Sequence, residues 1–190
     1  MARRSAVLSR ANGTRRARLM LIGEAPGRLG ADRTHEPFAG DRSGDNLSAL
    51  LAGAGIDKGD IYLTNAVLCC PTDGSRNFKP KAAELSNCRP FLRATIDAIQ
   101  PVVVATLGRV AFEQVRRALN LNLPRRPLSE LVGDPIPTPW FVLAPLYHPS
   151  PRVIHTRRSF DAQLADLTRV VRLLHDRVHR PGNRAAPSPG

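Results

Sequence analysis

Four short apolar runs are spaced along the chain and predict buried β-strands. They occupy residues 19–22, 61–64, 102–107 and 141–146, and a glycine or a more polar segment follows each run. Nearly every position in these runs is apolar, which is typical of strands that are covered on both faces. Such strands belong to parallel sheets, because crossover helices cover both faces of a parallel sheet.

Apolar residues at helical spacing lie between these runs and predict amphipathic helices. The first pattern covers residues 47–54, and later ones cover residues 81–99, 109–119 and 160–174. Pro90 interrupts the second pattern, where it would remove a helical hydrogen bond. Residues 72–80 and residues 120–139, which hold five prolines, predict connecting segments.

Strand and helix alternate four times, and this alternation predicts the α/β class. We expect a three-layer αβα sandwich with a central four-stranded parallel sheet. A chain of 190 residues is long enough for a single domain with a full core.

The two ends of the chain differ in composition from the rest. Residues 1–17 hold five arginines and no acidic residue, and they lack apolar periodicity, so we expect a basic flexible arm. Residues 181–190 are rich in proline and glycine and predict a disordered tail. The domain itself is expected to cover residues 18–180.

The formal net charge of +12 favours a polyanionic partner such as nucleic acid. Its carriers are 25 arginines and 3 lysines. An arginine-rich proteome would explain the preference for arginine over lysine, but it explains the net excess of positive charge less well.

Three cysteines do not make a disulfide framework, and no secretory signal precedes the first strand, so we expect a reducing cytoplasm. No apolar run reaches the roughly 18 residues of a membrane span, so we expect no membrane partner. No surplus apolar stripe suggests an interface, and a monomer is the default expectation.

The loop from Gly23 to Gly44 should lie at the edge of the sheet where α/β folds bind ligands. Gly23 and Gly27 let the backbone approach a ligand closely. The spacing of the glycines does not match the dinucleotide pattern G-x-G-x-x-G, and no phosphate-loop lysine follows, so a nucleotide cofactor is disfavoured.

Several residues of these loops have both a structural and a functional interpretation. Phe38 either anchors its loop on the core or stacks on a base. Glu24 and Asp41 either cap helices and solvate the rim or orient water. Asn65, at the end of the second strand, is either a turn residue or a reader of the edge of a base.

A second loop, His148-Pro149-Ser150-Pro151, follows the last strand and should reach the same edge. Its prolines would hold the histidine in a fixed position. Arg152, Arg157 and Arg158 follow closely and could contact phosphates.

These motifs, in this order, resemble the uracil-DNA glycosylase superfamily, and families 4 and 5 of Bacteria and Archaea in particular. GEAPG at residues 23–27 looks like the first motif of family 4, whereas GADRT at 30–34 and PFAGDRSG at 37–44 are more similar to family 5. TNAVLC at 64–69 and CRPFL at 88–92 resemble the middle of the superfamily. The resemblance covers residues 19–174 and leaves the branch open.

The resemblance implies a monofunctional enzyme that flips uracil out of DNA and leaves an abasic site. By resemblance, Phe38 stacks on the base, Asn65 binds its Watson–Crick edge, and His148 stabilises charge near uracil O2. Gly23, Ala25 and Gly27 contribute backbone to the pocket. The loop that includes Ser150 and Arg152 would wedge into the duplex and hold phosphates.

Two acids compete for the water-orienting role that the resemblance implies. Glu24 fits the pattern of family 4 and Asp41 fits that of family 5, with a slight preference for Glu24. The range of substrates is also open, because hypoxanthine, xanthine and ethenocytosine remain alternatives beside uracil.

The resemblance further implies a 4Fe-4S iron-sulfur cluster held by four cysteines. Cys69 and Cys88 match two of the four positions, Cys70 is additional, and the pair expected before the first strand is missing. Loss of the cluster or a start codon assigned too late is favoured over a non-cysteine ligand.

Two other functions compete with the enzyme. A non-catalytic member of the superfamily could bind damaged or single-stranded nucleic acid through the same groove, but it would not need Glu24, Asp41, Asn65 and His148 together. The missing phosphate-loop motif disfavours a small nucleotide-binding regulator.

Overall fold

A computed structural model describes residues 5–123 and 125–178 of the chain. A central sheet of five strands has the order β2-β1-β3-β5-β4. The strands are β1 (Leu19–Gly23), β2 (Tyr62–Asn65), β3 (Val103–Leu107), β4 (Ile136–Pro137) and β5 (Val142–Leu146). The predicted α/β class is confirmed, and β1, β2, β3 and β5 correspond to the four predicted strands and pair in parallel.

The fifth strand departs from the prediction of a four-stranded parallel sheet. β4 is only two residues long and pairs antiparallel with β5 at the sheet edge. It arises inside the proline-rich segment that predicted only a connection. A proline is tolerated on an edge strand, because one side of that strand needs no ladder hydrogen bond.

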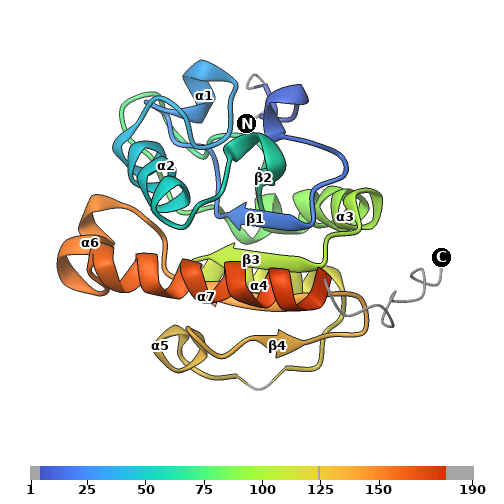
Figure 1. The fold of residues 1–190 in the computed structure, drawn as a ribbon. Coiled ribbons are helices and arrows are strands. Elements are labelled where there is room, and N and C mark those ends of the chain that lie inside the picture. Colours follow the sequence, from blue (N-terminus) through green and yellow to red (C-terminus); the bar gives the residue numbers. More distant parts are fainter. Residues whose placement is uncertain (1–4, 124, 179–190) are drawn as a thin grey trace.

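Helices cover both faces of the sheet and form the two outer layers (Figure 1). On one face, α3 (Ala82–Ile99) and α4 (Arg109–Ala118) pack over a core that includes Met20, Ile22 and Val104. On the other face, α2 (Arg42–Gly53) and α7 (Phe160–Val178) pack over the alternate positions, such as Leu21 and Val103. This alternation follows from the strand geometry, since successive side chains point to opposite faces.

The four predicted helices therefore all form, and α3 continues through Pro90. Three short helices were not predicted: α1 (Ala31–Thr34), α5 (Leu128–Leu131) and α6 (Pro151–Thr156). Among the described residues, a 3₁₀ turn η1 (Arg10–Asn12) precedes β1, and another, η2 (Lys58–Asp60), connects α2 to β2.

Residues 5–17, the described part of the flexible arm expected for residues 1–17, pack on the domain. The Asn12 Nδ2 donates a hydrogen bond of 2.7 Å to the Leu63 carbonyl, and the Val7 backbone N–H donates one of 2.8 Å to the Leu68 carbonyl. Gly13 forms an antiparallel bridge to Tyr62. Residues 5–17 thus cover the edge of β2. They bind mostly through backbone groups, which leave no apolar period in the sequence. The predicted tail at 181–190 lies outside the described residues.

Within residues 5–123 and 125–178, no helix combines the length and the hydrophobicity that a membrane span requires.

Candidate active site

A cleft of about 410 Å³ lies at the carboxyl ends of the parallel strands. The loops that follow β1, β2 and β5 all contribute to it, as expected for a parallel sheet. In Figure 1 the arrowheads of β1 and β3 point toward the side of the molecule on which α6 lies. The lining residues are Glu24, Ala25, Pro26, Gly27, Ala31, Phe38, Asp41, Ser43, Asn65, Pro71, Asn77, Phe78, His148, Ser150 and Val153. Nearly all of the predicted base-binding and catalytic residues are therefore in one place.

Gly23 brings Asn65 and Phe38 together at the floor of the cleft. Gly23 and Asn65 are paired residues at the ends of β1 and β2. A Cβ atom at Gly23 would overlap the Asn65 Oδ1 atom and would lie 2.5 Å from the Phe38 Cζ atom. Only glycine leaves room for both side chains, so this position requires it.

Asn65 is 4% exposed, and its side-chain amide has no hydrogen-bond partner among the described residues. Thr106 Oγ1 is the only fully buried side-chain polar atom of the described residues that lacks a hydrogen-bond partner, so the Asn65 amide still reaches the open cleft. Its two donors and its acceptor can instead serve a ligand that presents the complementary pattern.

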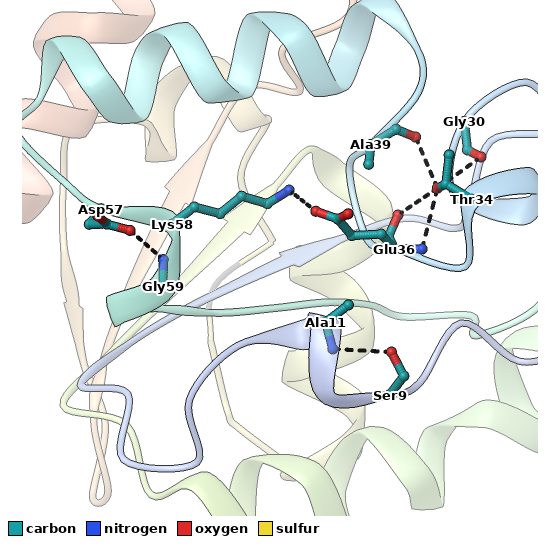
Figure 2. Close-up of polar contacts among 9 residues, drawn as sticks. All are labelled: Ser9, Ala11, Gly30, Thr34, Glu36, Ala39, Asp57, Lys58 and Gly59. Atoms are coloured by element: carbon teal, nitrogen blue, oxygen red, sulfur yellow. Dashed lines mark hydrogen bonds and ion pairs between the residues drawn. The ribbon is translucent and has the colours of Figure 1, made fainter.

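Phe38 is held by its loop in a backbone conformation that is unusual for a large side chain. Its φ angle is +53°, in the left-handed region. Figure 2 shows how the loop is braced: the Thr34 hydroxyl lies within hydrogen-bond distance of the carbonyls of Gly30, Glu36 and Ala39. The Lys58 Nζ donates to the Glu36 Oε1 at 2.6 Å and so ties the loop to η2.

His148 faces Phe38 across the cleft, with 6.4 Å between the ring centroids and an angle of 38° between the planes. Burial lowers the pKa of His148, and the nearby Asp41 carboxylate opposes that effect in part. The imidazole is therefore neutral at neutral pH and can donate one N–H.

The loop that carries His148 is fixed by two hydrogen bonds just after the histidine. The Asn46 Nδ2, on α2, donates to the Pro149 carbonyl at 2.8 Å. Ser150 lines the cleft and also caps α6, because its hydroxyl accepts from the Val153 N–H at 3.4 Å. The expected substrate-binding serine thus has a structural role as a helix cap.

The two candidate acids have different environments. Burial raises the pKa of Glu24, and Lys79 lowers it to a smaller extent. Asp41 is the N-cap of α2: its Oδ1 accepts from the Gly44 N–H at 2.9 Å. Its Oδ2 lies 2.7 Å from the position of a Cβ at Gly27 and would overlap one at Gly30, so these glycines admit the carboxylate.

The three arginines after the His148 loop separate into two kinds. Arg158 forms a two-pronged ion pair with Asp166 of α7, at 2.9 and 2.7 Å, and the Asp166 side chain is 1% exposed. Arg152 and Arg157 are exposed and have no ion pair among the described residues. The ion pair gives Arg158 a structural role in joining α6 to α7, and it leaves Arg152 and Arg157 as the cations available to a phosphate.

The cysteines do not provide the ligand set of a 4Fe-4S cluster. Burial raises the pKa of Cys69, and the Cys88 thiol raises it further to a smaller extent. Cys70 contacts the Asn77 Oδ1 instead, with 3.8 Å between sulfur and oxygen. In the described part of the chain, no three Cys, His, Asp or Glu side chains are grouped to hold a metal ion. The chain has three cysteines in all and the cluster needs about four thiolates, so the residues do not fit it.

Asn77 and Phe78 line the cleft, although the sequence identified residues 72–80 only as a connection. The available signal was a large apolar residue inside a polar loop. The same signal drew attention to Phe38.

Comparison with known proteins gives a consistent result. A family model described as the uracil DNA glycosylase superfamily matches residues 11–172. The chain is 31% identical over 170 residues to the type-5 uracil-DNA glycosylase of Pyrobaculum aerophilum, a match that spans 83% of this chain and 72% of the relative. It is 34% identical over 159 residues to the type-5 enzyme of Thermus thermophilus, spanning 77% and 70%. The type-4 enzyme of Archaeoglobus fulgidus is 35% identical over 110 residues, spanning 58% of this chain and 53% of the relative.

Proposed function

The chain belongs to the uracil-DNA glycosylase superfamily, and from that premise we propose that it hydrolyses the N-glycosidic bond of uracil in DNA. The observation that carries the proposal is the cleft, which gathers a buried amide, an aromatic ring, a histidine and two carboxylates around one space. Relatives that are named as glycosylases favour this enzyme over a non-catalytic nucleic-acid-binding protein.

The target nucleotide must leave the base stack before its glycosidic bond can be reached. The flipped base then lies against Phe38, and the Asn65 amide binds its Watson–Crick edge. Asn65 lines the open cleft, so the donors and the acceptor of its amide can bind the base in place of water. A site of this kind rejects analogues that present the wrong donors and acceptors.

The reaction breaks the bond between the sugar C1′ atom and the base nitrogen. The electron pair of this bond leaves with the base. The neutral His148 donates an N–H toward the O2 atom of the base and stabilises the negative charge that develops there. Water adds its oxygen to C1′, and the base anion takes up the proton that the water releases, so the products are the neutral free base and an abasic sugar.

Glu24 is the group we assign to orient this water. Its raised pKa makes the carboxylate a better proton acceptor than an ordinary glutamate. One Asp41 oxygen already caps α2. The negative charge of the Asp41 carboxylate acts on His148, and we assign this carboxylate to offset the positive charge of the sugar in the transition state.

DNA containing uracil is the proposed partner, with Arg152 and Arg157 as backbone contacts, and the proposed enzyme is a monomer of the cytoplasm. The chemistry assigned to these residues requires no 4Fe-4S cluster. Uracil is the proposed base, and the choice between the family 4 and family 5 substrate ranges is left to experiment.

The test is excision of a single uracil from an end-labelled oligonucleotide, with strand cleavage at the abasic site by alkali. We expect the full chain to excise uracil and to leave a matched thymine oligonucleotide intact. His148→Ala should lower the single-turnover rate about 10²–10³-fold, the usual effect of removing one donor to a developing charge. His175→Ala, which changes an exposed histidine of α7, is the control and should be unaffected. Absence of excision from both single- and double-stranded uracil DNA would contradict the proposal.

A further inference from the structure

Phe78 is a large aromatic side chain that stays 41% exposed although it lies at the cleft. It follows β2 in the chain and precedes α3. The mechanism above gives it no role, because Phe38 already supplies the ring against the excised base. An exposed aromatic ring beside a ligand cleft is a natural contact for a flat, apolar group.

The backbone of the segment that carries Phe78 is held by several hydrogen bonds. Thr72 and Asn77 form an antiparallel bridge, and the Thr72 hydroxyl donates to the Arg76 carbonyl at 2.6 Å. The Phe78 N–H donates to the Pro71 carbonyl at 2.7 Å. The Asn77 Oδ1 accepts from the Arg28 N–H at 3.0 Å, which ties this segment to the loop after β1. The backbone that carries the ring is therefore held in place, and a ligand need not order that backbone.

Two basic residues flank Phe78 in the chain segment. The Arg76 guanidinium carbon lies 4.9 Å from the centroid of the Phe78 ring. Lys79 follows Phe78 directly in the chain and is exposed, and its charge lowers the pKa of Glu24 in the cleft. An aromatic ring with two cations close to it in the chain suits a single strand of nucleic acid, whose bases stack while its phosphates pair with the cations.

We propose that Phe78 stacks on the nucleobase next to the excised one in the same strand, while Arg76 and Lys79 hold the adjoining phosphates. The buried end of the cleft, between Phe38 and Asn65, is filled by the excised base, whereas Phe78 is at the exposed end. A base that leaves the stack deprives its neighbour of a stacking surface, and the Phe78 ring replaces that surface. The inference rests on the proposed function in taking DNA as the ligand.

The test is a double-mutant cycle in DNA binding. The probe is a fluorescent single strand with 2′-fluoro-2′-deoxyuridine as a target that resists cleavage. Two further probes replace the 5′ or the 3′ neighbouring nucleotide by an abasic tetrahydrofuran spacer. Dissociation constants are measured by anisotropy for the full-length protein and its Phe78→Ala and Phe78→Leu variants. The leucine variant keeps apolar bulk but lacks a flat ring.

We expect both variants to bind the unmodified probe between about 5-fold and 150-fold more weakly, the range typical of base–aromatic stacking. With the spacer on one of the two sides, the same variants should bind less than about twofold more weakly than the wild type does on that probe, because the base that Phe78 contacts is absent. Phe78→Trp should bind at least as well as the wild type. Phe91→Ala removes a ring that is 59% exposed on α3 and does not line the cleft, and it should bind normally.

The proposal would be overturned if the Phe78 substitutions weakened binding to both spacer probes as much as binding to the unmodified probe. It would also be overturned if Phe78→Leu bound the unmodified probe as tightly as the wild type does. The proposed function fails separately, because its test is uracil excision by the wild type. Binding that depends on Phe78 and the neighbouring base, without any excision, would support this inference while contradicting the glycosylase.

Discussion

Gly23 shows how a single residue without a side chain sets the geometry of the cleft. Its missing Cβ leaves the space in which the Asn65 amide and the Phe38 ring meet. The sequence pointed to Gly23 as a place of close backbone approach, and the structure adds that two side chains of the cleft, rather than only a ligand, occupy that space.

Gly23→Ala should therefore displace Asn65 or Phe38 and lower uracil excision by about 10²-fold or more, because a misplacement of about 1 Å can cost that much. Single-turnover excision measures the loss, and circular dichroism checks the fold. Gly59→Ala is the control: its Cβ would meet only the Asp57 Oδ1, at 3.2 Å. Normal excision by Gly23→Ala would show that the floor of the cleft is not where the base binds.

The two acids are also distinguished at the scale of the residue. Glu24→Gln should lower excision more than Asp41→Asn does, because Glu24 is assigned to the water. Glu24→Gln should at the same time stabilise the fold at pH 7. The pKa of Glu24 is raised on folding, so the folded state holds the proton more tightly, and this stabilising contribution is lost as the pH rises through the folded-state pKa.

The gain in stability from Glu24→Gln should shrink as the pH falls toward the ordinary pKa of glutamate, where the wild-type side chain is protonated as well. Chemical denaturation at several pH values measures it, with Glu84→Gln of α3 as a control. A larger loss of excision in Asp41→Asn than in Glu24→Gln would transfer the water-orienting role to Asp41.

At the scale of elements, α6 and α7 are joined by the ion pair between Arg158 and Asp166. Asp166 is buried, and Arg169 also reaches its Oδ1 at 3.3 Å. This connection holds the segment that follows His148 against the body of the molecule. The sequence could not show that Arg158 has a structural role and Arg157 does not, because adjacent arginines differ only in the direction in which each side chain points.

Arg158→Ala should lower the free energy of unfolding by about 2 kcal/mol, less than the full cost of breaking a buried pair, because Arg169 still accompanies Asp166. Arg157→Ala is a matched control with an exposed side chain, and its stability should change by less than about 0.5 kcal/mol. DNA binding should show the opposite order, with the larger loss in Arg157→Ala. Equal stabilities of the Arg158→Ala and Arg157→Ala variants in a thermal melt would contradict the structural role of Arg158.

At the scale of the whole molecule, the net charge of +12 predicts how DNA binding responds to salt. Each phosphate that the protein neutralises contributes about −0.9 to the slope of log affinity against log salt. Two contacts, by Arg152 and Arg157, would lower the affinity about tenfold between about 50 and 200 mM salt, and further contacts would steepen the fall. Anisotropy measures the slope, and an uncharged peptide nucleic acid of the same sequence is the control. A flat response with DNA would contradict a groove that grips the backbone.

The sequence by itself determined the α/β class, the four parallel strands and the loops that meet at their carboxyl ends. These features depend on local apolar patterns and on the rule that parallel strands share one functional edge. Phe38, Asn65 and His148 could be named because each stands at a strand end or in a loop next to one. The shortage of cysteines for a cluster was likewise plain from the count.

Only the tertiary structure decided the roles that depend on distant partners. Residues 5–17 pack on β2 through backbone groups and Asn12, which leave no periodic signal. Arg158 differs from Arg157 because Asp166 folds back beside it. Phe78 reaches the cleft because Asn77 is bound to the loop after β1, a contact across 49 residues of chain. Long-range contacts of this kind depend on the packing of the whole chain, so short sequence patterns do not predict them.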